Sequence, residues 1–235
     1  MSLETLLSSG FAELGLPCPD SVLRNYRTYY ELLEETNKVM NLTAIHGEED
    51  VARLHFLDCA ALLSLEELSG KRVFDIGTGA GFPGLALKIA CPDLSLLLLD
   101  SLDKRIGFLR TVCSSLALED VTCLHARAEE AAAEYWEQAD AVTSRAVAGL
   151  NVLSEMCLPF VRVGGVFLAM KGPDYEEELS GAKHAIRELG GKTEQCSLYT
   201  IPGTDITHSL IRIRKIAPTP KKYPRRWAQI KKAPL

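Results

Sequence analysis

The stretch KRVFDIGTGAGFPG, residues 71–84, limits what this 235-residue chain can fold into. A short apolar run, Val73 to Ile76, predicts a buried strand, and four glycines follow it within eight residues. Glycine lets the backbone adopt positive φ and approach a ligand closely. Pro83 favours the first turn of a helix, whose free N–H groups and positive dipole attract anionic ligands. The stretch therefore predicts a strand, a glycine turn and a helix that hold a nucleotide-like cofactor.

Strand and helix patterns alternate after this stretch. Gly164 and Gly165 predict a turn before the fifth strand. The last two strands are close enough in sequence to pair as an antiparallel hairpin. This alternation predicts an α/β, Rossmann-like fold with a mostly parallel seven-stranded sheet that is covered on both faces. The expected strands lie at about residues 73–76, 94–100, within 121–130, and at 140–147, 166–171, 192–200 and 208–216.

Helical patterns and charge divide the chain. We expect a small N-terminal helical region, residues 1–68, packed on a cofactor-binding domain, residues 69–216, and a basic tail, residues 217–235. Residues 1–70 hold 12 acidic and 4 basic side chains, whereas residues 206–235 hold 9 basic and no acidic ones. A basic segment of this kind predicts contact with phosphates.

The composition argues against a membrane protein and against an oxidising compartment. The longest apolar run, Leu94 to Leu99, is far shorter than a membrane span. The N-terminal segment lacks a basic n-region, so we expect no secretory signal. Seven cysteines lie 10 to 41 residues apart without a CxxC pair. They indicate reduced thiols in a cytoplasmic protein and no metal site.

The acids around the glycines narrow the choice of cofactor. Asp75 precedes the first glycine, and the resulting pattern D-x-G-x-G-x-G resembles class I S-adenosylmethionine methyltransferases. Asp100 follows Gly77 by 23 residues at the end of the second strand, where an acid can hold ribose hydroxyls. Nicotinamide enzymes share this spacing, so an NAD-dependent Rossmann oxidoreductase is the alternative. No GK[ST] follows the glycines, which excludes a P-loop.

More specific runs are spread over nearly the whole chain. Together they resemble the RsmG (GidB) family, the bacterial 16S rRNA guanine-N7 methyltransferases, which have the class I methyltransferase fold. The combination of G-F-P-G with D-S-L-x-K-R is far more specific than a glycine loop alone. The runs are NLTAIHG (41–47), HFLD (55–58), FDIGTGAGFPG (74–84), LLLDSLDKRIGFLR (97–110), HARAEE (125–130), SRAV (144–147) and AMKG (169–172).

The resemblance implies a site for S-adenosylmethionine. Gly77 and Phe82 would line the methionine and adenosine positions, together with Gly79 of the glycine pattern. Ala128 and Glu129 would meet the adenine. Arg145, after the fourth strand, would complete the pocket, and Asp100 would hold the ribose, as its spacing from Gly77 predicts.

Several of these residues, and Asp75, also have a purely structural interpretation. Phe82 suits a core aromatic, Glu129 a surface charge, and Arg145 an ion pair with Asp140. Asp100 suits a turn at a strand end, and Asp75 suits a cap for the glycine loop. His55 and Asp58 share a helix face without a third metal ligand, so we expect them to fasten the N-terminal helices to the cofactor domain, beside Asn41 and Thr43.

The implied substrate is 16S rRNA or the small-subunit particle, with no membrane and no obligate protein partner. Guanine N7 carries a free lone pair, so we assign no catalytic acid or base. We expect Lys171, Tyr223 and Arg225 to contact RNA, with Tyr223 or Trp227 stacking on bases. Removing residues 217–235 should then weaken RNA binding and spare cofactor affinity. A non-catalytic RNA-binding protein with a structural cofactor site is a further alternative.

Overall fold

The computed structural model describes residues 1–145 and 148–235, and its centre is one seven-stranded sheet in the order β3-β2-β1-β4-β5-β7-β6. All seven predicted strands are present, although positions 146–147 of the expected fourth strand lie outside the described residues. The strands are β1 (Arg72–Ile76), β2 (Ser95–Asp100), β3 (Val121–His125), β4 (Ala139–Arg145), β5 (Val161–Lys171), β6 (Gly191–Thr200) and β7 (Thr207–Lys215).

The direction of the strands confirms the predicted fold class. The β1 to β5 strands are parallel to one another, whereas β7 lies between β5 and β6 and is antiparallel to both. The β1 strand lies at the centre, where Phe74 is in register with both Leu97 and Val142. The usual dinucleotide-binding sheet has the order 3-2-1-4-5-6, with no strand between the fifth and the sixth. The inserted antiparallel strand therefore disfavours the oxidoreductase alternative.

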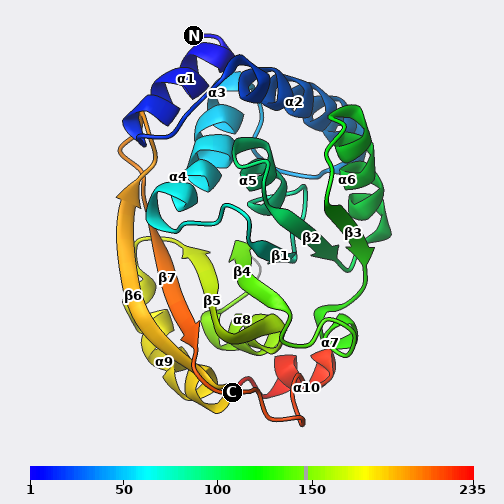
Figure 1. Ribbon diagram of the computed structural model, residues 1–235, viewed down its shortest axis with the longest axis vertical. Coiled ribbons are helices and arrows are strands. Elements are labelled where there is room, and N and C mark those ends of the chain that lie inside the picture. Colours follow the sequence, from blue (N-terminus) through cyan, green and yellow to red (C-terminus); the bar gives the residue numbers. More distant parts are fainter. Residues whose placement is uncertain (146–147) are drawn as a thin grey trace.

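Helices cover both faces of this sheet (Figure 1). The first six helices and the π-helical turn η1 pack on one face, and α7, α8 and α9 pack on the other. Among the described residues, no helix has both the length and the apolar character needed to cross a membrane. The helices are α1 (Leu3–Glu13), α2 (Asp20–Met40), α3 (Glu48–Val51), η1 (Ala52–Leu57), α4 (Asp58–Leu65), α5 (Gly84–Ala90), α6 (Asp103–Ser115), α7 (Ala128–Ala131), α8 (Leu150–Cys157), the 3-10 turn η2 (Leu158–Phe160), α9 (Tyr175–Glu188) and α10 (Trp227–Lys232).

Alternation along the strands creates two apolar cores. Val73 points into the core beneath the N-terminal helices, and its neighbour Phe74 points into the core beneath α8 and α9. Tyr26 and Tyr29 of α2 are fully buried in the first core, where the Tyr26 hydroxyl donates to the carbonyl of Ala86 in α5 at 2.8 Å. The N-terminal helices thus share a core with the sheet. The division at residue 68 stays a prediction.

The structure corrects the expected turn at Gly164 and Gly165. Both glycines lie inside β5, which begins at Val161, beside a register shift against β4. Gly164 has φ of 86°, and a Cβ on Gly165 would lie 2.7 Å from the carbonyl oxygen of Asp140. The pair therefore forms an irregularity within a longer strand, where two backbones approach closely.

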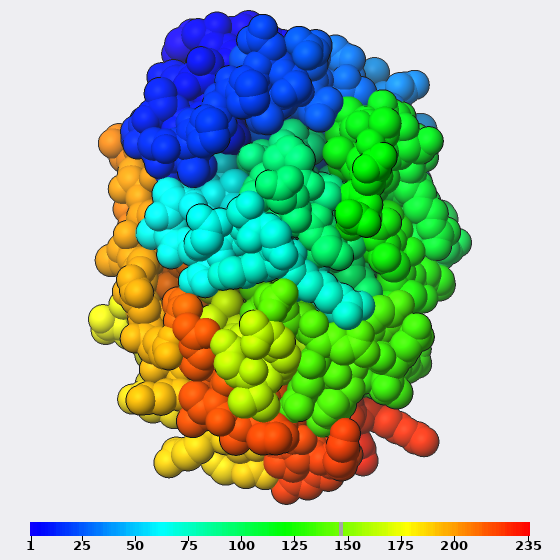
Figure 2. Space-filling view, in the orientation of Figure 1, coloured from blue at the N-terminus to red at the C-terminus, as the bar shows by residue number. Residues whose placement is uncertain are grey.

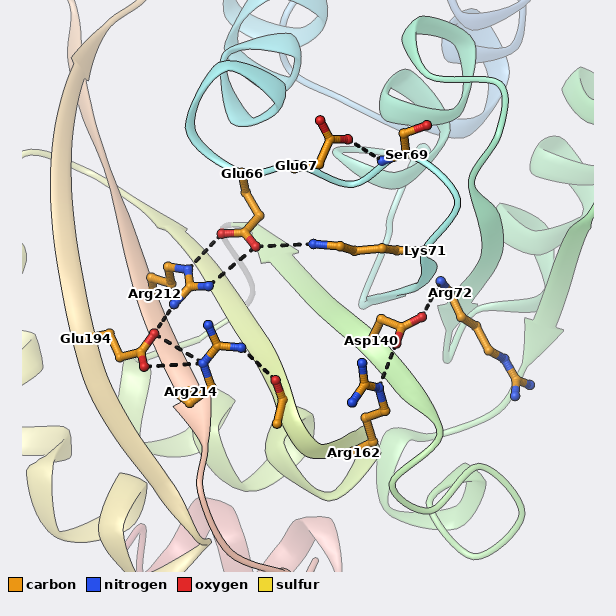
Figure 3. A network of polar contacts seen from close by, with 11 residues as sticks. Glu66, Glu67, Ser69, Lys71, Arg72, Asp140, Arg162, Glu194, Arg212 and Arg214 are labelled. Atoms are coloured by element: carbon orange, nitrogen blue, oxygen red, sulfur yellow. Dashed lines mark hydrogen bonds and ion pairs between the residues drawn. The ribbon is translucent and has the colours of Figure 1, made fainter.

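Ion pairs join the segments at the end of the sheet where β1 and β4 begin (Figure 3). Glu66 accepts from Arg212 at 2.7 Å and lies 3.5 Å from the ammonium of Lys71. Glu194 of β6 pairs with Arg212 and with Arg214 of β7. Many cations at this end are therefore paired within the protein.

Figure 2 shows the N-terminal residues and the C-terminal tail at opposite ends of the molecule.

Candidate active site

A cavity of about 520 Å³ opens at the carboxyl ends of the parallel strands. Its walls come from the glycine turn after β1, the end of β2, the start of α7 and the end of β4. The N-terminal region and the C-terminal tail each contribute further residues. The lining consists of Leu42, Thr43, His55, Gly77, Thr78, Gly79, Ala80, Phe82, Leu99, Asp100, Ser101, Arg105, Ala126, Arg127, Ala128, Glu129, Arg145, Met156 and Trp227.

The glycine turn presents its backbone to this cavity. Gly77 and Thr78 both donate their N–H groups to the Leu99 carbonyl, at 2.8 and 3.0 Å, which fixes the turn to β2. Gly79 has φ of 60°, and a Cβ built on it would have no atom of the described residues within 4 Å. A side chain at this position would fill space that the turn leaves open to a ligand.

Asp100 connects the glycine turn to the start of α6. Its carboxylate is buried and accepts hydrogen bonds from the Gly79 N–H at 3.0 Å, the Leu102 N–H at 2.9 Å and Arg105 at 3.2 Å. The turn interpretation of Asp100 is therefore confirmed. Asp100 also lines the cavity, as the cofactor interpretation requires. Its role toward ribose stays a prediction.

Asp75 supports the loop from behind the cavity. Its Oδ2 accepts from the Gly84 N–H at 2.8 Å, which confirms the expected cap of the glycine loop. Its Oδ1 is buried without a hydrogen-bond partner in the described part of the chain. Burial raises the pKa of Asp75 from the ordinary 3.8 to about 6, although the Gly84 N–H opposes this increase.

Replacing Asp75 with asparagine should flatten the pH dependence of stability. Because the pKa in the native state exceeds that in the unfolded chain, native Asp75 binds more protons between pH 4 and 6. Its favourable contribution is complete below about pH 4 and is lost as the pH rises through 6, a change of about 3 kcal/mol. The asparagine variant retains an oxygen for Gly84 and should therefore melt at a higher temperature at pH 7.5.

Thermal melts of both proteins from pH 4 to 7.5 measure this effect. Asp140→Asn is the matched control, because Asp140 is half-buried and Arg72 and Arg162 hold its pKa below the usual range despite its burial. That variant should lose stability at pH 7.5. An Asp75→Asn protein whose stability changed with pH as steeply as the wild type would contradict the assignment.

Phe82, His55 and Arg145 form a stacked group at one wall of the cavity. The His55 ring stacks on Phe82 with centroids 4.1 Å apart and planes inclined by 12°. The Arg145 guanidinium carbon lies 5.2 Å from the centroid of the Phe82 ring. Arg145 pairs with Asp58 at 2.8 Å, while Asp140 pairs with Arg162 instead. The expected alternative partner of Arg145 was therefore wrong, and the fastening role of Asp58 is confirmed.

His55 is held neutral in this group. Its Nδ1 lies 2.7 Å from Arg145 Nη2, an obligate donor, and its Nε2 lies 2.9 Å from the Thr43 hydroxyl. Burial and the charge of Arg145 lower the pKa of His55 from 6.5 to about 3. Both ring nitrogens are therefore engaged with protein groups.

The opposite wall of the cavity joins α7 to the C-terminal tail. Ala128 and Glu129 begin α7, and both line the cavity as predicted. Glu129 accepts from the backbone N–H of Trp227 at 3.2 Å, so the first residue of α10 lies directly at the site. Trp227 also lines a second hollow, together with the exposed Arg127 and Arg226.

Three residues expected to contact RNA lie outside this lining. The Lys171 ammonium donates to the Ala148 carbonyl and to Glu178, both at 2.6 Å. Tyr223 is only 7% exposed, and its hydroxyl donates to Glu188 at 3.3 Å. Arg225 forms a bidentate pair with the buried Glu155. These polar atoms are committed to internal carboxylates or carbonyls, so RNA contacts need other cations.

Several lining residues were not predicted to lie at the cofactor site. Leu42 and Met156 are ordinary apolar residues in helical or loop surroundings, and Arg105 resembles a surface charge. Thr43 and His55 stood in the runs NLTAIHG and HFLD, which gave them a family resemblance but no place in the cavity. Only the packing of the N-terminal region against the sheet brings them there.

Comparison with known proteins identifies the family. The family model GidB, described as rRNA small subunit methyltransferase G, matches residues 23–203. This protein belongs to the GidB family. "Ribosomal RNA small subunit methyltransferase G" of Alkaliphilus metalliredigens is 47% identical over 238 residues, covering 100% of both chains. The proteins of the same name from Clostridium botulinum (strain Loch Maree) and Clostridium tetani are 45% and 42% identical, again over 100% of both chains.

Solved structures agree on the fold of this GidB member. TrmN from Thermus thermophilus has a TM-score of 0.54 at 20% identity and covers 67% of this chain and 48% of its own. TYW2 of M. jannaschii, solved in complex with AdoMet, has a TM-score of 0.52 at 16% identity, covering 63% and 70%. These likenesses support the class I methyltransferase fold.

Proposed function

We propose that this protein transfers the methyl group of S-adenosylmethionine to N7 of a guanine in 16S rRNA of the small ribosomal subunit, in the cytoplasm. The observation that carries the proposal is one cavity in which the glycine turn, Asp100 and Arg145 meet, in a member of the GidB family. The names of the close relatives support ribosomal RNA as the substrate.

The residues of the cavity fit this cofactor. The Asp100 carboxylate is placed to accept from ribose hydroxyls, and the Arg145 guanidinium to pair with the methionine carboxylate. Ala126 and Ala128 offer apolar surface for the adenine. The Gly79 backbone has positive φ, and a Cβ built there would meet no atom of the described residues within 4 Å, so the turn leaves room for a ligand. When bound, the cofactor supplies a methyl group made electrophilic by its sulfonium.

The chain contributes alignment to this reaction. Guanine N7 has a lone pair in the plane of the base and loses no proton when it is methylated. His55, the one imidazole among the described residues of the lining, uses both ring nitrogens for Arg145 and Thr43 and is not a base. Holding the two reactants in line can supply about 7–11 kcal/mol of the barrier. Rigid support of Phe82 and Arg145 serves that purpose.

We place the RNA contact at the second hollow beside Trp227. Arg127 and Arg226 flank it and are exposed, and neither forms an ion pair within the described part of the chain. The hollow shares Arg127, Glu129 and Trp227 with the cofactor cavity. RNA held there by its phosphates would have a base next to the site of transfer.

Arg127→Ala combined with Arg226→Ala should weaken RNA binding and reduce its salt dependence. Loss of two phosphate contacts should make the slope of log K against log salt shallower by about 1.4 to 1.8. Fluorescence anisotropy with a labelled 16S fragment at several salt concentrations measures this slope. Lys183→Ala with Lys192→Ala removes the same charge from α9 and β6 and is the control. Equal slopes for the two double variants would contradict the assignment.

Methyl transfer itself is tested with small subunits from cells that lack the modification. Radiolabelled S-adenosylmethionine should label the 16S rRNA, and mass spectrometry of the digested RNA should show one added N7-methylguanine. Saturating cofactor binding without label in RNA would favour the non-catalytic alternative. Binding of NADH in place of S-adenosylhomocysteine would favour the oxidoreductase.

A further inference from the structure

A buried carboxylate receives hydrogen bonds from three separate parts of the fold. Asp58, the first residue of α4, is fully buried. Its Oδ2 accepts from Arg145 of β4 at 2.8 Å. Its Oδ1 accepts from the Tyr199 hydroxyl of β6 and lies the same 2.8 Å from His208 Nδ1 of β7. Asp58 does not appear among the described residues that line the cavity, so it lies behind the wall that Arg145 forms.

The protonation states of this cluster suit a fixed geometry. Burial alone would raise the pKa of Asp58, but His208, Arg145 and Tyr199 hold it below the ordinary value, so the carboxylate is charged. Burial and the adjacent carboxylate raise the pKa of Tyr199, which keeps the proton that it donates. Arg145, Tyr199 and His208 therefore all donate hydrogen bonds to the charged Asp58 carboxylate.

Two residues of η1, the segment directly before Asp58, also hold the Arg145 guanidinium. Its Nη1 also donates to the Leu54 carbonyl at 3.0 Å, and its Nη2 donates to His55 Nδ1. Phe82 lies against the face of the guanidinium. The long Arg145 side chain at the end of β4 is thereby held in one orientation, and the Asp58 carboxylate behind the cavity wall balances its charge.

We propose that Asp58 is a positioning residue for methyl transfer, which acts by holding Arg145 against Phe82 at the cofactor cavity. Tyr199 and His208 extend this support to the β6–β7 hairpin, so an edge of the sheet outside the cavity takes part in shaping it. The proposal rests on the proposed function for its kinetic consequence. Its structural consequence, for ligand binding, does not depend on methyl transfer.

A double-mutant cycle tests whether Asp58 acts through Arg145. Asp58→Asn, Arg145→Gln and the double variant are compared by the Kd for S-adenosylhomocysteine and by kcat/KM with small subunits. Each single variant should weaken binding and lower kcat/KM about 10- to 100-fold, the range for a lost hydrogen bond to a charged group. The double variant should be no worse than the worse single variant, because both remove the same interaction. Effects that multiply would overturn the proposal.

A second set of variants keeps the test valid if Asp58→Asn folds poorly. Tyr199→Phe leaves the ion pair intact and removes one hydrogen bond to Asp58, so it should lower kcat/KM about 3- to 10-fold and lower the melting temperature by a few degrees. Its neighbour Leu198 is 58% exposed, and Leu198→Ala is the control that should retain wild-type kinetics. A Tyr199→Phe protein with wild-type kcat/KM and wild-type Kd would contradict the proposal. Absence of methyl transfer by the wild type would instead refute the proposed function and leave the binding cycle interpretable.

Discussion

Replacing Gly84 with alanine should destabilise the native state by about 1–3 kcal/mol, although the residue starts a helix and has an ordinary backbone conformation. A Cβ at this position would lie 2.7 Å from Asp75 Cβ and 2.7 Å from Leu98 Cδ2. Both atoms belong to central strands, β1 and β2, which cannot move aside without disrupting the sheet. The α5 helix would therefore be displaced from the sheet.

This displacement should also reach the cofactor cavity. The hydrogen bond from the Gly84 N–H to Asp75 fixes the end of the glycine turn, and Gly79 at the turn's centre is bonded to Asp100. We expect the Kd for S-adenosylhomocysteine to rise at least about tenfold, the equivalent of one strained or lost hydrogen bond. Urea denaturation and calorimetric titration measure the two effects.

Gly107→Ala is the matched control for this prediction. Gly107 lies within α6, and a Cβ there would meet no atom within 4 Å in the part of the chain that the structure describes. The change should stabilise the protein by about 0.5–1 kcal/mol, because glycine is the poorer helix former, and should leave the Kd unchanged. If Gly84→Ala resembled Gly107→Ala in stability, close packing of α5 on the sheet would not be the reason for a glycine at residue 84.

The sheet and the glycine turn could be predicted because their signals are local. Apolar runs of strand length, glycines at a turn and a proline at a helix start each reflect the conformation of a few neighbouring residues. The seven strands and the direction of the final hairpin followed from those runs. The acids at residues 75 and 100 were placed correctly because each stands at the end of such a strand.

The partners of Arg145 could not be predicted in this way. Asp140 is close to it in sequence, but β4 is extended, and five residues of a strand separate the two by about 16 Å. Its actual partner, Asp58, is 87 residues away and reaches it only because the N-terminal helices pack on the sheet. The π-helical turn η1, which contains Leu54 and His55, has no sequence signal that distinguishes it from an ordinary helix.

The internal ion-pair partner of Arg225 in the tail could not be predicted from the sequence either. This ion pair gives the prediction with the largest effect on stability. Arg225→Met should destabilise the protein by about 3–5 kcal/mol, the typical result of leaving a buried carboxylate without its charged partner. Glu155 of α8 is fully buried and receives the Arg225 backbone N–H, Nε and Nη2, at 2.8, 2.9 and 2.6 Å. The exposed Arg226 is the control, and Arg226→Ala should change stability by no more than about 0.5 kcal/mol.

Loss of the ion pair between Arg225 and Glu155 should also weaken cofactor binding, contrary to the expectation that the tail serves RNA alone. Arg225 precedes α10, whose Ile230 is fully buried and whose Trp227 forms part of the cavity wall. Release of α10 would open that wall, so the Kd for S-adenosylhomocysteine should rise in Arg225→Met and in a chain ending at residue 216. Adding Glu155→Leu to Arg225→Met should restore most of the stability, because it removes the unpaired charge. Wild-type Kd in the truncated chain would show that the tail does not shape the cofactor site.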